Sequence, residues 1–143
     1  MHIVKAREAE AVEIVRLNRG FHLPFPWFIW DRLNWVREEI REGNFFVAKE
    51  GNRILGAICL KISPKEGRID TLAVRRDSRR LGVGRKLVAF AKRRTRKEEG
   101  KRLIVSSFIS YGVGGFYERC GFKKSSEIYW YRNQPCHRFR MNV

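Results

Sequence analysis

A basic loop that contains glycine is the segment of this sequence best suited to chemistry with phosphate. Arg79, Gly82 and Gly84 form the pattern Arg-x-x-Gly-x-Gly between a predicted strand and a predicted helix. The first amides of a helix lack intrahelical acceptors and lie at the positive end of its dipole, so they bind phosphate well. Glycine lets a ligand approach the backbone, and Arg80 and Arg85 add positive charge. The pattern predicts a phosphate cradle, although an ordinary helical turn is an equally good interpretation of it alone.

A second motif lies further along the chain, after the next predicted strand. It consists of Phe116-Tyr117 followed by Gly121-Phe122. Together with the basic loop and the preceding Leu72–Val74, it resembles the acyl-CoA-binding core of the GNAT N-acetyltransferase superfamily. The predicted order of elements is similar to that family over nearly the whole chain. The resemblance implies an enzyme that transfers an acetyl group from acetyl-CoA to a primary amine, by direct attack through a tetrahedral intermediate.

The resemblance also implies where acetyl-CoA, as co-substrate, would bind. The loop would hold the pyrophosphate through main-chain amides, and the strand before it would pair with pantetheine, which acts as an inserted strand. Ser110 stands where many relatives have an asparagine that contacts pantetheine. No metal is required. The residues assigned to cofactor binding are Leu72, Ala73, Val74, Arg79, Arg80, Leu81, Gly82, Val83, Gly84, Arg85, Ser110 and Phe116.

Two residues are assigned to proton transfer through the same resemblance. Tyr117 matches the tyrosine that commonly protonates the departing CoA thiolate, and packing is its alternative role. An alkyl amine is mostly protonated at neutral pH and must lose a proton before it attacks. Relatives carry a glutamate for this step near the position of Arg68, which this chain lacks. Asp70, on the same strand face, is assigned as base or water-relay partner; an ion pair with Arg68 is the alternative, and Glu66 is a weaker candidate.

Aromatic residues are the expected contacts of the amine acceptor. In the family, the acceptor groove is formed by the first helix pair and the last two strands. Phe25 and Trp27 in the first region, and Trp130 in the second, are the predicted substrate contacts. Pro24 and Pro26 keep the first two rings near a loop, whereas core packing is the alternative for most aromatic residues here.

Apolar periodicity predicts the elements that position these residues. Val12 and Val15 are expected to face inward from the first helix, and Asn133–Pro135 is the expected last turn. The resulting fold class is α/β: a single GNAT-like domain over residues 1–143, with a mixed, mostly antiparallel central sheet flanked by helices and splayed at the strands after residues 68 and 102. The predicted strands are His2–Ala6, Phe45–Lys49, Arg53–Ser63, Arg68–Val74, Leu103–Phe108, Phe122–Arg132 and Cys136–Val143; the predicted helices are Glu8–Arg19, Ile29 to Ile40, Gly82 to the residue before Gly100, and Gly114–Arg119.

Composition narrows the class of protein. The chain has 143 residues, of which 43% are hydrophobic, enough for one core without disulfides or a structural metal. Cys59, Cys120 and Cys136 are too widely spaced for a zinc motif and are expected to be free thiols. No apolar run approaches a membrane span and the first residues lack a signal-peptide core, so a soluble cytoplasmic protein is expected.

Charge points to an acidic partner. Lys and Arg number 31 against 15 Asp and Glu, a net charge of +16, and Arg75 to Arg102 carries thirteen basic against three acidic residues, a net charge of +10. A nucleic-acid-binding module is therefore one alternative function. A non-catalytic acyl-CoA sensor is another, because Ser110 replaces the family's asparagine and the family's glutamate is missing. The acceptor (a protein, peptide, small amine or RNA-linked amine) and the oligomeric state, monomer or homodimer, remain open. A solvated surface is slightly favoured for the distal basic cluster Lys92, Arg93, Arg94, Arg96 and Lys97.

Overall fold

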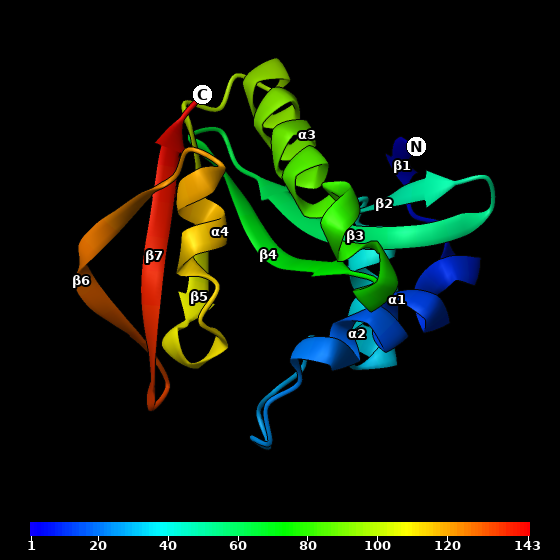
Figure 1. The fold of residues 1–143 in the computed structure, drawn as a ribbon, viewed down its shortest axis with the longest axis horizontal. Helices are drawn as coiled ribbons and strands as arrows, with labels where there is room; N and C mark the ends of the chain where they lie inside the picture. The colour runs from blue at the N-terminus through cyan, green and yellow to red at the C-terminus, as the bar shows by residue number, and fades with distance from the viewer. The chain divides into compact units, whose positions relative to one another are not determined.

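Seven strands form one mixed sheet in the order β1-β2-β3-β4-β5-β7-β6 in the structure, a computed structural model that describes residues 1–143 (Figure 1). The pairs β1–β2, β2–β3, β5–β7 and β6–β7 are antiparallel, and β4–β5 is parallel. The predicted fold class, a mixed sheet flanked by helices, is confirmed. The elements in chain order are β1 (His2–Lys5), α1 (Ala11–Asn18), α2 (Leu33–Arg41), β2 (Phe45–Glu50), β3 (Arg53–Ile62), β4 (Glu66–Val74), α3 (Val83–Lys97), β5 (Arg102–Phe108), α4 (Gly114–Arg119), β6 (Lys123–Tyr131) and β7 (Gln134–Asn142).

The chain divides into two compact units. The N-terminal unit comprises Met1–Leu60 and Thr71–Leu87, and the C-terminal unit comprises Lys61–Asp70 and Val88–Val143. The strands β3 and β4 and the helix α3 each contribute residues to both units. The phosphate loop therefore belongs to the N-terminal unit, whereas Tyr117 belongs to the C-terminal unit.

Helices α1 and α2 cover one face of the β2–β3 hairpin in the N-terminal unit. The register pairs Val47 with Ala57 and Phe45 with Cys59, so these alternate residues share a face. They form a buried core with Ile14 of α1 and other apolar residues of the two helices. The hydrophobic stripe of each helix is thus matched to every second residue of the strands.

The start of α3 packs on the other face of this hairpin, at Gly56. A Cβ atom at this position would lie 3.0 Å from the Ala73 carbonyl oxygen, 3.0 Å from Val83 Cγ1 and 3.1 Å from Leu87 Cδ1. These distances are shorter than ordinary van der Waals contacts, so a side chain at position 56 would force the start of α3 and the end of β4 to move apart. Gly56 therefore helps to place the end of β4 and the N-terminus of α3 side by side.

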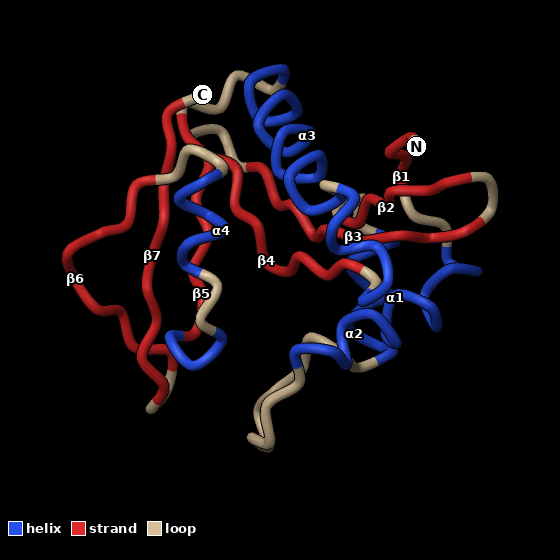
Figure 2. The backbone as a smooth tube through the Cα atoms, in the orientation of Figure 1, coloured by secondary structure: helices blue, strands red, loops and turns tan.

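Helices pack on one face of the sheet in the C-terminal unit. The α3 residue Thr95 lies against Gly67 of β4, and Gly114 of α4 lies against Phe139 of β7. Figure 2 shows β6 bowing away from β7 between their ends, where the register shifts between Lys124 and Ile128. The bow is a β-bulge, because more residues of β6 than of β7 span this interval.

Two expectations for the N-terminal helices were wrong. A 3₁₀ helix, Glu8–Glu10, precedes α1, and Val12 is 48% exposed instead of inward. The buried positions of α1 are Ala11, Ile14, Val15 and Asn18, an i, i+3, i+4, i+7 stripe that leaves Val12 outside it. Ile29 is not helical, because Arg32, the residue before α2, is extended, with φ −90° and ψ 135°.

Two strand boundaries also differ from the prediction. The predicted strand began at Arg68, but Gly67 already lies inside β4, where it allows contact with Thr95. The last turn comprises Arg132 and Asn133, so that Gln134 and Pro135 already pair within β7. Arg132 takes a positive φ of 55°, which permits the tighter two-residue turn.

None of the helices combines the length and the apolar composition that a membrane crossing requires.

Candidate active site

The predicted phosphate loop has a backbone suited to an approaching ligand. After β4, a 3₁₀ helix, Arg76–Leu81, leads to Gly82, which has a positive φ of 74°. Glycine adopts this conformation without strain, and no other atom lies within 4 Å of where its Cβ would be. The helix α3 begins at Val83, and its first amides have no intrahelical acceptor. Open space therefore adjoins the positive end of a fifteen-residue helix.

Arg53 of β3 and Arg75, just after β4, form ion pairs with nearby carboxylates. Asp77 accepts from the guanidinium groups of Arg53 and Arg75, and Arg75 also lies 3.9 Å from a carboxylate oxygen of Glu13. A hydrogen bond from the Ser78 hydroxyl, together with Arg53, lowers the pKa of the exposed Asp77 carboxyl. These contacts hold the 3₁₀ helix against the β3 hairpin.

The arginines within the loop are not engaged in this way. Arg79, Arg80 and Arg85 are exposed and make no ion pair. Leu81 is also exposed, at 62%, although it is apolar. Arg75 therefore has a structural role, whereas Arg79, Arg80 and Arg85 are available to an anionic ligand.

The end of β4 carries an additional polar group that the sequence analysis did not assign. Ala73 is buried, whereas Leu72 and Val74 are half-buried, which is the alternation between two faces that a strand produces. Thr71 is 5% exposed, and its Oγ1 has no hydrogen-bond partner. A buried hydroxyl without a partner is uncommon, so a ligand or water at this strand is a natural partner for it. In the sequence, the only signal for Thr71 was its position among the alternating apolar residues of the predicted strand.

Tyr117 is a buried residue of α4 in the C-terminal unit. It is 7% exposed, and its ring packs against Phe116, Phe122 and Phe139 at centroid distances of 5.2 to 5.6 Å. Burial, with a smaller contribution from Cys120, raises the pKa of its phenol above the ordinary value. The hydroxyl therefore stays protonated throughout the physiological range.

Asp70 takes part in the ion pair that the sequence allowed. Its Oδ1 accepts from Arg68 Nε at 2.7 Å, and its Oδ2 lies 3.2 Å from Lys61 Nζ. The other candidate carboxylate, Glu66, accepts from Arg102 at 3.1 Å. Both carboxylates are held by cations, and Asp70 is the more buried of the two.

The aromatic loop between α1 and α2 is ordered by polar contacts. The rings of Phe25 and Trp27 are stacked, with centroids 4.9 Å apart and an interplanar angle of 3°. Buried Asn18 donates to the Trp30 carbonyl oxygen at 2.8 Å, and His22 Nδ1 lies 2.7 Å from Asp31. Sequence reasoning did not single out Asn18, although a polar residue on the apolar stripe of a helix was a usable signal.

The remaining predicted site residues lie in the C-terminal unit. Ser110 is exposed in a 3₁₀ helix, Ile109–Tyr111, and Phe116 is half-buried in α4. Trp130 is 66% exposed on β6, so it does not belong to the core. Cys59 and Cys136 are buried free thiols and Cys120 is half-buried, as the spacing of the cysteines predicted.

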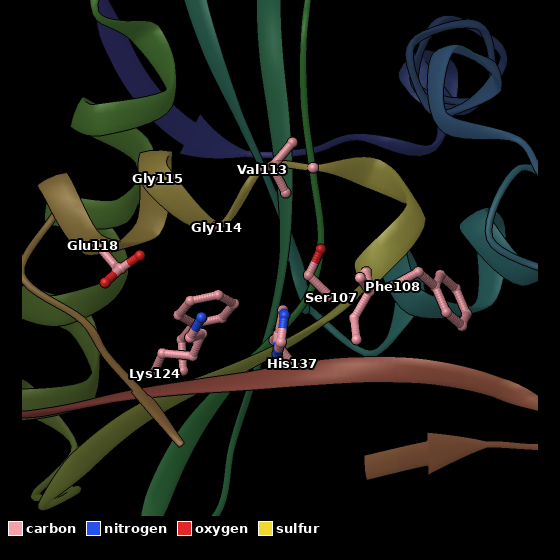
Figure 3. A pocket seen from close by; sticks show the side chains of 11 residues that line it. Ser107, Phe108, Val113, Gly114, Gly115, Glu118, Lys124 and His137 are labelled. Atoms are coloured by element: carbon pink, nitrogen blue, oxygen red, sulfur yellow. The ribbon is translucent and has the colours of Figure 1, made fainter. Parts of the chain in front are cut away.

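A cavity of about 320 Å³ lies between the loop before α4 and the strands β5 and β7. Figure 3 shows Glu118, Lys124 and His137 around it, from α4, β6 and β7. Glu118 and Lys124 make no ion pair, and Nδ1 of His137 is buried without a partner. The cavity therefore offers polar groups of both signs beside the helix that carries Tyr117, and none of the three had been assigned a role from the sequence.

More than half of the chain matches a single protein family. Residues 41–124 match the family model described as the acetyltransferase (GNAT) domain. The chain therefore belongs to the GNAT acetyltransferase family, as its motifs implied. The match covers both the basic loop and the helix with Tyr117.

Individual relatives agree with this assignment. The human protein called probable N-acetyltransferase 14 is 37% identical over an alignment of 92 residues, and the match covers 57% of this chain and 45% of that protein. The chain thus spans about half the length of the curated relatives it matches. Two solved structures share the fold. Ard1 from Thermoplasma volcanium has a TM-score of 0.83 and 18% identity, and the match covers 99% of this chain and 97% of Ard1. Rv2747 from Mycobacterium tuberculosis, in complex with CoA, has a TM-score of 0.80 and 17% identity, and the match covers 100% of this chain and 99% of Rv2747.

Proposed function

We propose that this protein is an N-acetyltransferase that transfers the acetyl group of acetyl-CoA to a primary amine. The neutral amine attacks the thioester carbonyl carbon, and the carbonyl oxygen becomes an oxyanion. Collapse of the tetrahedral intermediate breaks the C–S bond, so that the acetyl group stays on nitrogen. The nitrogen loses one proton to give the amide, and the thiolate takes up a proton. Main-chain amides of Leu72–Val74 are the proposed donors to the oxyanion.

The geometry of the basic loop is the observation that carries this proposal. Gly82 has a positive φ and free space at its Cβ, next to the first amides of α3 and three arginines without carboxylate partners. A pyrophosphate needs amide donors and positive charge at such a position. The unpartnered Thr71 hydroxyl is a further donor or acceptor for the pantetheine arm. Rv2747, which shares the fold, holds CoA in its solved structure.

Proton transfer is proposed for two side chains. Tyr117, kept protonated by burial, donates to the thiolate as the C–S bond breaks. Asp70 accepts the amine proton, directly or through water, and this role requires Lys61 or Arg68 to release one carboxylate oxygen. The alternative role of Asp70 is structural, as the ion-pair partner of Lys61 and Arg68.

The acceptor is proposed to contact aromatic rings, of which Phe25 and Trp27 are half-buried and Trp130 is exposed. Phe25 and Trp27 form a stacked pair in the loop between α1 and α2, and Trp130 is exposed on β6. Such rings supply apolar area and a flat surface for stacking. A peptide, a small amine and an RNA-linked amine all offer the required nitrogen.

A product assay tests the activity. Acetyl-CoA is incubated with a panel of peptides and amines, CoA release is followed with a thiol reagent, and acetylated products are identified by mass spectrometry. The proposal predicts release that depends on both the amine and the protein. Tight acetyl-CoA binding without any product over the panel would instead support the acyl-CoA sensor.

The substitution Gly82→Val tests the phosphate cradle. A β-branched side chain at this position would occupy the space over the first amides of α3, so acetyl-CoA affinity is expected to fall several-fold or more. Isothermal titration calorimetry measures the affinity. Gly51→Val is the matched control, because Gly51 also has a positive φ, 60°, and no atom within 4 Å of its Cβ position. Both variants have the same kind of backbone strain, but only Gly82→Val should lose affinity for acetyl-CoA. Unchanged acetyl-CoA affinity in folded Gly82→Val would contradict the cradle assignment.

A further inference from the structure

We infer that the helix-free sheet face of the C-terminal unit binds single-stranded nucleic acid. The face carries cations from four adjacent strands, and this inference does not depend on the proposed acetyl transfer. The residues that define this basic sheet face are Arg68 of β4, Arg102 of β5, Lys123 of β6, and Arg138 and Arg140 of β7.

Strand register aligns these cations across the sheet. Arg68 pairs with Ile104, Ile104 pairs with Arg140, and Arg140 pairs with Lys123, which makes one row over four strands. Neighbouring strands are about 4.8 Å apart, so such a row spans roughly 15 Å. Arg138 lies two residues from Arg140 along β7 and therefore on the same face. The pairing, not sequence proximity, assembles the cluster.

The cations point away from the helices. Their neighbours Ile69, Leu103, Val105 and Phe139 are buried on the opposite face, where α3 and α4 pack. The four outer cations of the basic sheet face are exposed, and Arg138 is half-buried. The alternation of a strand thus gives the unit an apolar inner face and a cationic outer face.

Local carboxylates neutralise only part of this charge. Arg68 pairs with Asp70 and Arg102 pairs with Glu66, whereas β5 and β7 contain no acidic residue. Arg140 and Lys123 make no ion pair. The cations of this face without a carboxylate partner are therefore Lys123 of β6 and Arg138 and Arg140 of β7.

The planar guanidinium group of Arg138 is held in place by two contacts. Its guanidinium lies 4.0 Å from the centroid of the Tyr129 ring, and its Nε donates to Ser106 Oγ at 3.3 Å. A stacked guanidinium keeps donors free at its edge and offers its outer face to another planar group. Tyr131, on the same face by register, is 41% exposed. The face therefore combines phosphate-binding cations with planar groups on which bases can stack.

The composition of the face favours nucleic acid over an acidic protein. Ile104 is the one apolar residue in the cationic row, whereas the centre of a protein–protein interface is normally apolar and depleted of charge. Interfaces with nucleic acid are more polar and much more positive. A single strand is favoured over a duplex because its bases are accessible to the Arg138–Tyr129 pair and to Tyr131.

The test compares two triple variants that lose the same charge. Lys123→Gln/Arg138→Gln/Arg140→Gln removes the uncompensated cations of the basic sheet face. Arg93→Gln/Arg96→Gln/Lys97→Gln, the matched control, removes three exposed cations of α3. Fluorescence anisotropy measures the binding of a labelled single-stranded RNA oligonucleotide of mixed sequence over a range of salt concentrations. Circular dichroism confirms that each variant is folded, and the single variant Arg140→Gln provides a smaller perturbation if the triple variant is not.

We expect the affinity of the sheet-face variant to fall by at least about tenfold, with its log–log salt slope reduced by about 0.7 for each phosphate of the single strand that is no longer neutralised. The affinity of the control is expected to fall by at most about twofold, because its cations lie on α3 and not on the sheet face. Equal losses of RNA affinity in both variants would show that binding depends only on the net charge of the protein, and would overturn the assignment. Tighter binding of duplex than of single strand, or displacement of the RNA by poly-L-glutamate at equal charge concentration, would overturn it as well. Unchanged RNA affinity in the folded sheet-face variant would have the same consequence.

Discussion

Burial decides what the hydroxyl of Tyr117 can do. The ring is 7% exposed among aromatic side chains, and the raised pKa of its phenol keeps the proton in place at neutral pH. A packing role alone needs the ring but not the hydroxyl. The two roles are therefore separable by removing one oxygen atom.

The substitution Tyr117→Phe is expected to lower turnover by about 10²- to 10⁴-fold when departure of the thiolate limits the rate, with little change in acetyl-CoA affinity. Steady-state kinetics with any accepted amine and calorimetric titration of acetyl-CoA measure the two quantities. Since the phenol stays protonated, the ratio of wild-type to variant turnover should be constant from neutral pH to mildly alkaline pH. Equal turnover of the two proteins would leave Tyr117 as a packing residue.

A buried ion pair makes stability depend on pH at Glu10. Burial opposes ionisation of this carboxyl, but hydrogen bonds from the Lys49 ammonium and from the Arg7 amide, with the charges of both residues, lower its pKa overall. A lowered folded-state pKa stabilises the native protein above the ordinary value of 4.5, and this contribution is lost as the pH falls through the lower folded-state value.

Replacing Glu10 with Gln should therefore flatten the acid side of the stability profile. At neutral pH the variant is expected to be less stable by about 1 to 3 kcal/mol, because Lys49 loses its carboxylate partner. The difference from wild type should shrink as the pH falls below 4.5. Urea unfolding at several pH values measures it, with Glu42→Gln, an exposed residue, as control. A difference that stays constant with pH would contradict the linkage.

At the scale of elements, close approach between α3 and β4 depends on missing side chains. A Cβ at Gly67 would lie 2.2 Å from Thr95 Oγ1, and one at Gly100 would lie 2.6 Å from Thr95 Cγ2. Thr95 is fully buried, and its hydroxyl donates to the Ala91 carbonyl oxygen at 2.8 Å. The end of α3 is thus packed directly on the backbone of β4.

The substitution Gly67→Ala is expected to destabilise the protein by about 1 to 3 kcal/mol, because its methyl group overlaps Thr95. Chemical unfolding measures the loss of stability. The cost of the substitution should be smaller in a Thr95→Ala background, since residues in contact couple energetically. Gly20→Ala, where no atom lies within 4 Å, is the control and should be nearly neutral. An equal cost of Gly67→Ala in both backgrounds would show that overlap with Thr95 is not the cause.

For the whole molecule, the excess of positive charge opposes folding. The net charge is +16, and many of the cations are exposed without a carboxylate partner. Compacting like charges raises the free energy of the folded state, and salt screens this repulsion. If attractive ion pairs dominated instead, salt would lower the stability of the folded protein.

The free energy of unfolding is therefore expected to rise between about 0.02 and 0.3 M sodium chloride, a range over which the screening length falls steeply. Urea unfolding monitored by tryptophan fluorescence measures this change. The sheet-face triple variant, with three fewer positive charges, should show a weaker increase than wild type. Stability that falls with salt would mean that attractive ion pairs dominate the electrostatics of the fold.

The sequence by itself determined the family and the order of elements. The motifs around Gly82 and Tyr117 each involve only a few consecutive residues, so they could be recognised in the sequence without knowledge of the fold. The alternation of β4 and the bounds of α4 were also predictable, because apolar periodicity is a local property. Even there, long-range packing overruled local signals at Gly67, Val12 and the last turn.

Only the tertiary structure decided which charged groups act together. Arg68, Lys123 and Arg140 are far apart in the chain, and strand register places them in one row. The same register and packing set the ion pairs of Asp70, the burial that keeps Tyr117 protonated, and the cavity beside His137. The physical reason is that pairing between strands and desolvation depend on residues distant in sequence, which neither spacing nor composition reports.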